Sequence, residues 1–62
     1  MFCYALFLDN KQIKVYPYSI TQPSDEKRAL GLALALRDAA KANGYHYTIE
    51  HFGASGVGTI IK

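Results

Sequence analysis

A single long helical segment with strand-like sequence on both sides most restricts how this chain can fold. Ser24 can cap a helix, and Asp25 and Glu26 place two acids in its first turn. The alanine- and leucine-rich sequence continues to about Asn43, and Gly44 suits the left-handed residue that ends many helices. Some twenty residues at ~1.5 Å each make a rod of ~30 Å, which is long enough to cross a four-stranded sheet.

The segments on either side of this helix have the composition of β-hairpins. Residues 2–8 are apolar, turn residues follow, and residues 13–18 are again strand-like. Beyond the helix, residues 45–52 alternate and 57–61 are mostly β-branched, with a glycine-rich turn between the two segments. We therefore expect one two-layer α+β domain over residues 1–62, ordered ββαββ, with one helix packed on a mostly antiparallel four-stranded sheet. The first strand is apolar on both faces, so we place it centrally, in the spatial order 2-1-3-4.

The chain has few means of stabilising a small core. Its 62 residues contain one cysteine, Cys3, so no disulfide can form within the chain. His46 and His51 are the other common soft-metal ligands, and together with Cys3 they are too few for a four-ligand zinc site. A domain of this length buries only ~60% of the surface of its unfolded chain. Association is the remaining device, and we expect a homodimer, a complex with a larger protein, or both, without cofactor or metal.

Helical periodicity separates two sets of leucines. Leu32 and Leu36 fall with several alanines on the expected core stripe, whereas another leucine pair, one turn apart, falls on the opposite side beside two cations. Exposed apolar residues rimmed by charge are typical of a protein interface, although single exposed leucines are also common. The predicted partner-binding residues on the helix are Leu30, Leu34, Arg37 and Lys41.

A second candidate surface follows if Asn10 and Lys11 form the tip of the first hairpin. Aromatic residues then gather around a lysine on the face of the sheet that one helix cannot cover. Such a face can bind a protein, stack on nucleic-acid bases, or merely be half exposed. The predicted residues are Phe7, Lys14, Tyr16 and Tyr18. A net charge of +2 and the lack of an RNP1 pattern favour a protein partner over nucleic acid.

Residues capable of catalysis form no recognisable set. On an extended strand His46 and Glu50 share one face ~13 Å apart, whereas His51 points to the other. Ser55 lies in a glycine-rich turn that lacks the second glycine of a nucleophile elbow, because Val57 stands there. We therefore expect no enzyme and no catalytic residue.

The chain resembles small tautomerases of the 4-oxalocrotonate type in length, in the helix start Ser24-Asp25-Glu26 and in the later segment His51-Phe52-Gly53. That resemblance would imply an N-terminal catalytic proline. This sequence begins Met1-Phe2 and has a whole predicted hairpin before the helix, and the distance from the helix start to the later segment is too short. We therefore do not place the chain in this family.

Together these features predict a small, non-enzymatic protein-binding module that acts by occluding a larger complex. The length and the lack of a catalytic set suggest an inhibitor from a phage or mobile element, similar in size to anti-CRISPR proteins. No apolar run is long enough for a membrane span and the first residues lack signal-peptide features, so we expect a cytoplasmic protein with no membrane partner. The alternative is a small nucleic-acid-binding module that uses sheet aromatics with flanking Lys and Arg.

Overall fold

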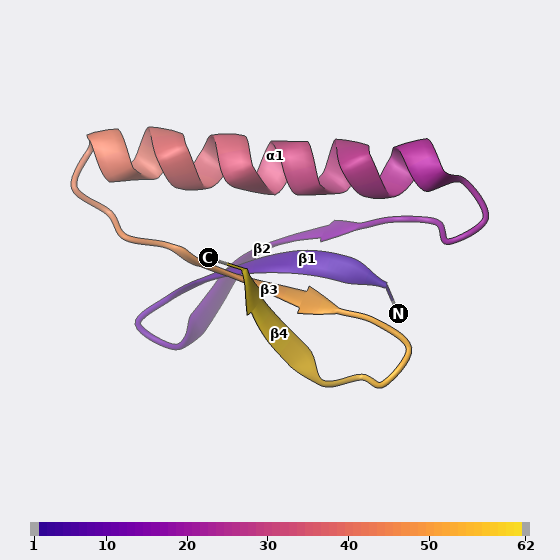
Figure 1. The fold of residues 1–62 in the computed structure, drawn as a ribbon. Coiled ribbons are helices and arrows are strands. Elements are labelled where there is room, and N and C mark those ends of the chain that lie inside the picture. The colour runs from indigo at the N-terminus through magenta and orange to yellow at the C-terminus, as the bar shows by residue number, and fades with distance from the viewer. Residues whose placement is uncertain (1, 62) are drawn as a thin grey trace.

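The computed structural model describes residues 2–61 and shows a four-stranded sheet with a helix along one side (Figure 1). The strands are β1 (Cys3–Leu8), β2 (Lys11–Pro17), β3 (Thr48–Phe52) and β4 (Gly58–Ile61), and the helix is α1 (Pro23–Ala42). All neighbouring strands are antiparallel, in the order β2-β1-β3-β4. The predicted ββαββ order, the two layers and the central position of β1 are confirmed.

The first hairpin turns one residue earlier than predicted. Asp9 and Asn10 both have positive φ, at 52° and 66°, which is the left-handed backbone of a tight two-residue hairpin turn. Leu8 therefore pairs with Lys11. A bulge then leaves Ile13 without a partner on β1 and shifts the register of the remainder of β2.

This register decides which face of the sheet each β2 residue occupies. Tyr16 lies opposite Tyr4. Lys14 lies opposite Leu6, and both tyrosines and Leu6 belong to the packing between the sheet and α1. Because a one-residue slip moves every side chain of a strand to the other face, the predicted placement of Lys14 and Tyr16 on the uncovered face is wrong.

The start of the helix follows backbone geometry and not side-chain capping. α1 begins at Pro23, and its N-cap is Gln22, two residues before the predicted cap Ser24 and without a side-chain hydrogen bond. Proline suits the first position because its missing N–H would have no partner within the helix. Ser24 therefore lies inside the first turn and is not the cap. At the other end Asn43 is the C-cap, and Gly44 has φ 87°, the left-handed conformation expected there.

α1 approaches the sheet through alanines. Ala29 and Ala33 are fully buried and form the core with Tyr4, Leu6 and Ile49. Alanine ends at Cβ, so the helix backbone can lie close to the large side chains of the sheet.

The helix is consequently rotated relative to the prediction. Leu30, Leu34 and Leu36 are partly buried against the core, whereas Leu32 is 43% exposed. The outward placement of Leu30 and Leu34 is wrong, as is the core placement of Leu32, while Leu36 does contact the core. The prediction centred the buried stripe on leucines, but small residues occupy the closest approach and leucines flank them.

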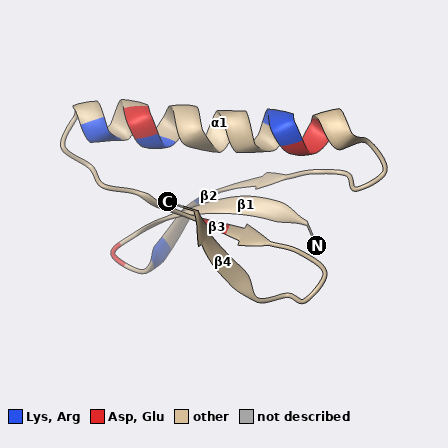
Figure 2. Cartoon of the chain, viewed as in Figure 1, with Lys and Arg blue, Asp and Glu red and all other residues tan. Residues whose placement is uncertain are grey.

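Charged residues lie mainly near both ends of α1 and around the turn between β1 and β2 (Figure 2). Within residues 2–61, no helix has both the length and the apolar character needed to cross a membrane.

Candidate functional site

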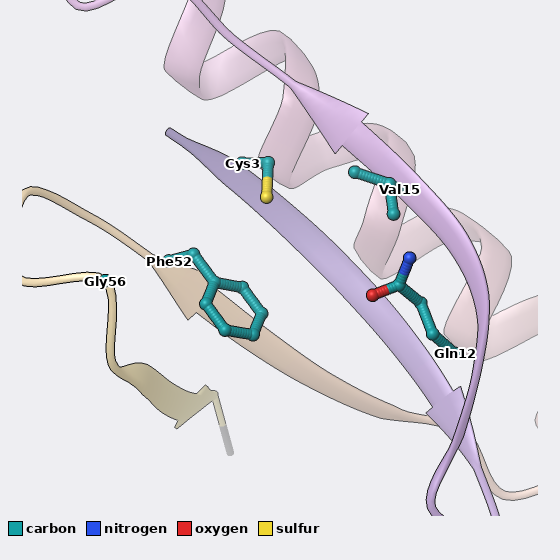
Figure 3. Close-up of a pocket in the computed structure, with 5 residues that line it drawn as sticks. All are labelled: Cys3, Gln12, Val15, Phe52 and Gly56. Carbon is teal, nitrogen blue, oxygen red and sulfur yellow. The ribbon is translucent and has the colours of Figure 1, made fainter. Parts of the chain in front are cut away.

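We call the face of the sheet turned away from α1 the open face. Strand alternation and register place on it Cys3, Ala5, Phe7, Gln12, Val15, Thr48, Glu50, Phe52, Gly58 and Ile60. Among these residues Glu50 is the only charged one. In Figure 3 the helix lies behind the sheet, and several of these side chains stand on the near side.

The open face is concave because small residues occupy its centre. Cys3 and Ala5 lie on the central strand and are 8% and 1% exposed, although no helix covers them. Cys3 pairs with Phe52 on β3, and Ala5 pairs with Val15 on β2. The larger side chains on the flanking strands therefore shield the small ones between them.

A shallow hollow of about 330 Å³ lies on this face. Its lining residues are Cys3, Gln12, Val15, Phe52 and Gly56 (Figure 3). The thiol of Cys3 lies on β1 and the ring of Phe52 on the neighbouring strand β3. The amide of Gln12 is the main polar group. This volume is at the lower end of the ~300–1,000 Å³ typical of ligand pockets. The size and the apolar lining suit a single inserted apolar side chain.

Two glycines shape the border of the hollow. Gly56 has φ 75°, which lets the chain turn between β3 and β4. A Cβ at Gly58 would lie 3.1 Å from Cε1 and Cζ of Phe52 and would collide with Oε1 of Glu50. The missing side chain at Gly58 therefore gives the ring of Phe52 and the carboxylate of Glu50 room to lie across β4.

A group of aromatic and polar residues occupies the opposite face, between the sheet and α1. The Tyr4 hydroxyl donates to Oε2 of Glu26 at 2.8 Å, and the Tyr18 hydroxyl is hydrogen-bonded to Nε2 of His51 at 2.5 Å. The Tyr4 ring stacks on His51, with centroids 4.5 Å apart. These contacts tie β1 to α1 and the end of β2 to β3.

Both tyrosines of this group hold their protons strongly. Burial, followed by the hydrogen bond to Glu26 and its charge, raises the pKa of Tyr4 from 10.0 to about 12. Burial, followed by the charge of Glu26, also raises the pKa of Tyr18. At neutral pH both hydroxyls are protonated, and that of Tyr4 donates to Glu26.

The structure separates the residues predicted for the second surface. Phe7 lies on the open face, whereas Tyr16 and Tyr18 pack against the core beneath α1. Nζ of Lys14 lies 5.6 Å from the centroid of the Tyr16 ring, also on the helix side. The predicted aromatic cluster around a lysine on the uncovered face is therefore not formed.

The residues predicted on the helix are likewise divided. Leu30 and Leu34 contact the core, while Arg37 and Lys41 line a second hollow of about 260 Å³ at the C-terminal end of α1. Its other lining residues are Asp38, His46 and Tyr47. Nε of Arg37 lies 3.7 Å from Oδ1 of Asp38, so one of the two cations is already partly neutralised. The partner-binding role of these residues stays a prediction, but no leucine ridge accompanies the cations.

Sequence reasoning missed Val15 and Phe52 as the walls of the hollow. One signal was present, since β1 alternates small residues, Cys3 and Ala5, with the large Tyr4. That alternation indicates that the face carrying Cys3 and Ala5 has short side chains in this part of the central strand. The walls themselves depend on the register across three strands.

The predicted alternation is confirmed for Glu50 and His51, but β3 begins at Thr48 and not at residue 45, so the predicted placement of His46 on one strand face with Glu50 is wrong. Glu50 lies on the open face and His51 on the helix face, while His46 precedes the strand. Among the described residues, no three His, Cys, Asp or Glu side chains are close enough to hold a metal ion. Comparisons of the chain with protein-family models, curated proteins and solved structures found no match.

Proposed function

We propose that the chain is a small protein-binding module and that the open face is its docking surface. The observation that carries this proposal is the contrast between the two sides of the sheet: α1 covers one, and the other presents a concave apolar surface with a hollow at its centre. Exposed apolar surface of this kind is a common mark of protein interaction sites.

The chemistry of the open face indicates what it would accept. The hollow fits one aliphatic or aromatic anchor, and such anchors supply most of the energy of many interfaces. Glu50 has no ion-pair partner within residues 2–61. A complementary partner therefore presents an apolar anchor with a Lys or Arg beside it.

The size of the face limits the contact. Four strands at ~4.8 Å spacing and five or so residues at ~3.3 Å give a face of roughly 300–400 Å² in projection. A standard interface buries about 800 Å² per partner. The open face therefore suits a short segment or a small patch of a larger protein, with residues outside the sheet adding to the contact.

Occlusion of that patch is the mechanism we propose, and an inhibitor from a phage or mobile element, acting in the cytoplasm, is the narrower prediction. The docking surface supports the first of these, and the second stays a prediction. The nucleic-acid alternative is less favoured, because among residues 2–61 the open face carries no Lys or Arg to meet phosphates.

The test is differential capture from a nuclease-treated lysate of the native host. Immobilised wild type is compared with Gln12→Lys and Val15→Glu, which place charges at the hollow, and with the control Leu32→Glu on the solvent side of α1. Circular dichroism checks the fold of each variant. A protein retained by wild type and Leu32→Glu but lost from both hollow variants supports the proposal, and equal capture by all four contradicts it.

A second measurement uses the single thiol. Cys3 lines the hollow, so a docked partner should protect it from a small alkylating reagent. Mass spectrometry would report alkylation with and without the captured protein. A Cys3 that is alkylated in the free chain and at the same rate in the complex would exclude the hollow as the contact.

A further inference from the structure

The sheet has two edge strands, and they differ in how well they are protected from further pairing. The outer edge of β2 carries Lys11 and Lys14, a bulge at Ile13 and a proline, Pro17. Lysines, prolines and bulges are the usual devices that keep an edge strand from adding another strand. Nη2 of Arg28 also donates to the carbonyl oxygen of Pro17 at 3.2 Å.

β4, at the other edge, has none of these devices. Its four residues, Gly58, Thr59, Ile60 and Ile61, carry no charge, and its register with β3 is unbroken. The two central residues are exposed, Ile60 by 58%. Because β4 pairs with β3 on one side, its outward N–H and C=O groups can pair with another strand.

We propose that β4 pairs antiparallel with β4 of a second copy of this chain, which joins two four-stranded sheets into one continuous sheet. The argument for a second copy is electrostatic. In a two-fold antiparallel pair the strand residue nearest the axis faces its own counterpart, so a charged edge repels itself. β2 would bring lysines together, whereas β4 brings together uncharged, β-branched side chains.

The register of the β4–β4 pair follows from which face of the sheet each side chain occupies. Side chains directly opposite each other must lie on the same face of the joined sheet. Ile60 lies on the open face and can meet its own counterpart there, while Thr59 meets Ile61 of the other copy on the helix side. This register covers the isoleucine that is most exposed on the strands. Both helices then lie on one side, and the two open faces form one continuous surface.

This inference concerns the edge of the sheet and is independent of the docking function proposed for the open face. It is tested by sedimentation of the wild type, Ile60→Lys on β4, and the control Ile13→Lys on the β2 edge, each at tens to hundreds of micromolar. Wild type and Ile13→Lys should sediment at twice the 6.9 kDa chain mass, and Ile60→Lys at the monomer mass with an unchanged circular dichroism spectrum. A monomeric wild type across that range, or a dimer that survives Ile60→Lys, overturns the proposal.

Amide hydrogen exchange of the wild type gives a test that needs no variant. In an antiparallel edge strand, one of two successive N–H groups points to the inner neighbour and the other points outward. Pairing should slow exchange of the outward amide among Thr59 and Ile60 by roughly tenfold or more as the protein is concentrated. Fast, concentration-independent exchange of that amide contradicts strand pairing, and if the protein is nevertheless dimeric, it assigns the contact to another surface such as the open face.

Discussion

The two faces of the sheet both bury residues of the central strands β1 and β3, but by different means. On the helix side large side chains such as Leu6 and Ile49 meet the alanines of α1 and are fully covered. On the open side Cys3 and Ala5 are hidden because they are small and lie between taller neighbours. Burial on the helix side comes from packing between the sheet and α1. Burial on the open side comes from differences in side-chain size within the sheet itself.

This difference separates stability from recognition. Removing a large side chain from the helix side leaves a cavity between layers, which the structure cannot easily close. Trimming the open face enlarges a hollow that is already in contact with solvent. Substitutions on the two faces of neighbouring strands should therefore differ strongly in their effect on the free energy of unfolding.

The largest expected effect is that of Leu6→Ala, which should lower the free energy of unfolding by ~2–5 kcal/mol because the side chain is fully buried. Val15→Ala, on the half-buried open face, should cost less than about 1 kcal/mol. Urea unfolding followed by circular dichroism measures both. Equal losses would mean that the open face is covered in solution.

The origin of this asymmetry was only partly predictable from the sequence. Strand and helix composition sufficed for the ββαββ order and the central β1. The faces of β2 were not predictable, because Asp9 and Asn10, not Asn10 and Lys11, form the turn and Ile13 is bulged. Both features depend on the competition between local turn geometry and cross-strand packing.

The rotation of α1 could not be obtained from hydrophobicity for a related reason. Leucine is more apolar than alanine, so a pattern argument turns leucines inward. At Ala29 and Ala33 the distance between α1 and the sheet determines which side chains fit, because the sheet already presents the large side chains of Tyr4 and Leu6 there. The required size of a contacting residue depends on its partner, which a single helix sequence does not reveal.

A second prediction sharpens the contrast by overfilling the layer interface. Ala33→Leu should destabilise the fold by ~1–3 kcal/mol, because its extra atoms have no space above the sheet. Ala35→Leu on the exposed side should change the free energy of unfolding by no more than about 0.5 kcal/mol. Thermal unfolding of both variants tests this, and a stable Ala33→Leu protein would show that the interface is loosely packed.

The third prediction concerns the hydrogen bond between the layers. Tyr4→Phe should cost about 1 kcal/mol through loss of the bond to Glu26. The raised pKa of Tyr4 means that the folded state favours the protonated hydroxyl, so its contribution is complete below pH 10.0 and is lost as the pH rises toward about 12.

Phenolate absorbance during an alkaline titration should show a step near pH 12 that Tyr4→Phe removes. Glu26→Gln should move that step to lower pH, because a neighbouring negative charge no longer opposes ionisation. A step that is unchanged in Tyr4→Phe would assign the high pKa to another tyrosine.

The smallest expected effect lies outside both faces, at the start of α1. Asp25 accepts hydrogen bonds from Nε of Arg28 and from the backbone N–H of Ser19, each at 2.7 Å, and these lower the pKa of its carboxyl group. Its contribution to stability is present above the unfolded-state pKa of 3.8 and is lost as the pH falls through the lowered folded-state pKa. Asp25→Asn should flatten the acid side of a plot of melting temperature against pH, and an unaltered slope would show that this carboxylate contributes nothing.

The pairing of β1 with both β2 and β3 has a consequence for how quickly the chain can reach its structure. β1 and β2 are joined by a two-residue turn, so their ladder can form within microseconds. β1 meets β3 only after the chain has passed through all of α1, and closing so long a loop costs more entropy. We therefore expect each hairpin to form early and the docking of one hairpin on the other to be the rate-limiting step. The contact between Leu6 and Ile49 belongs to that step and should set the height of the folding barrier.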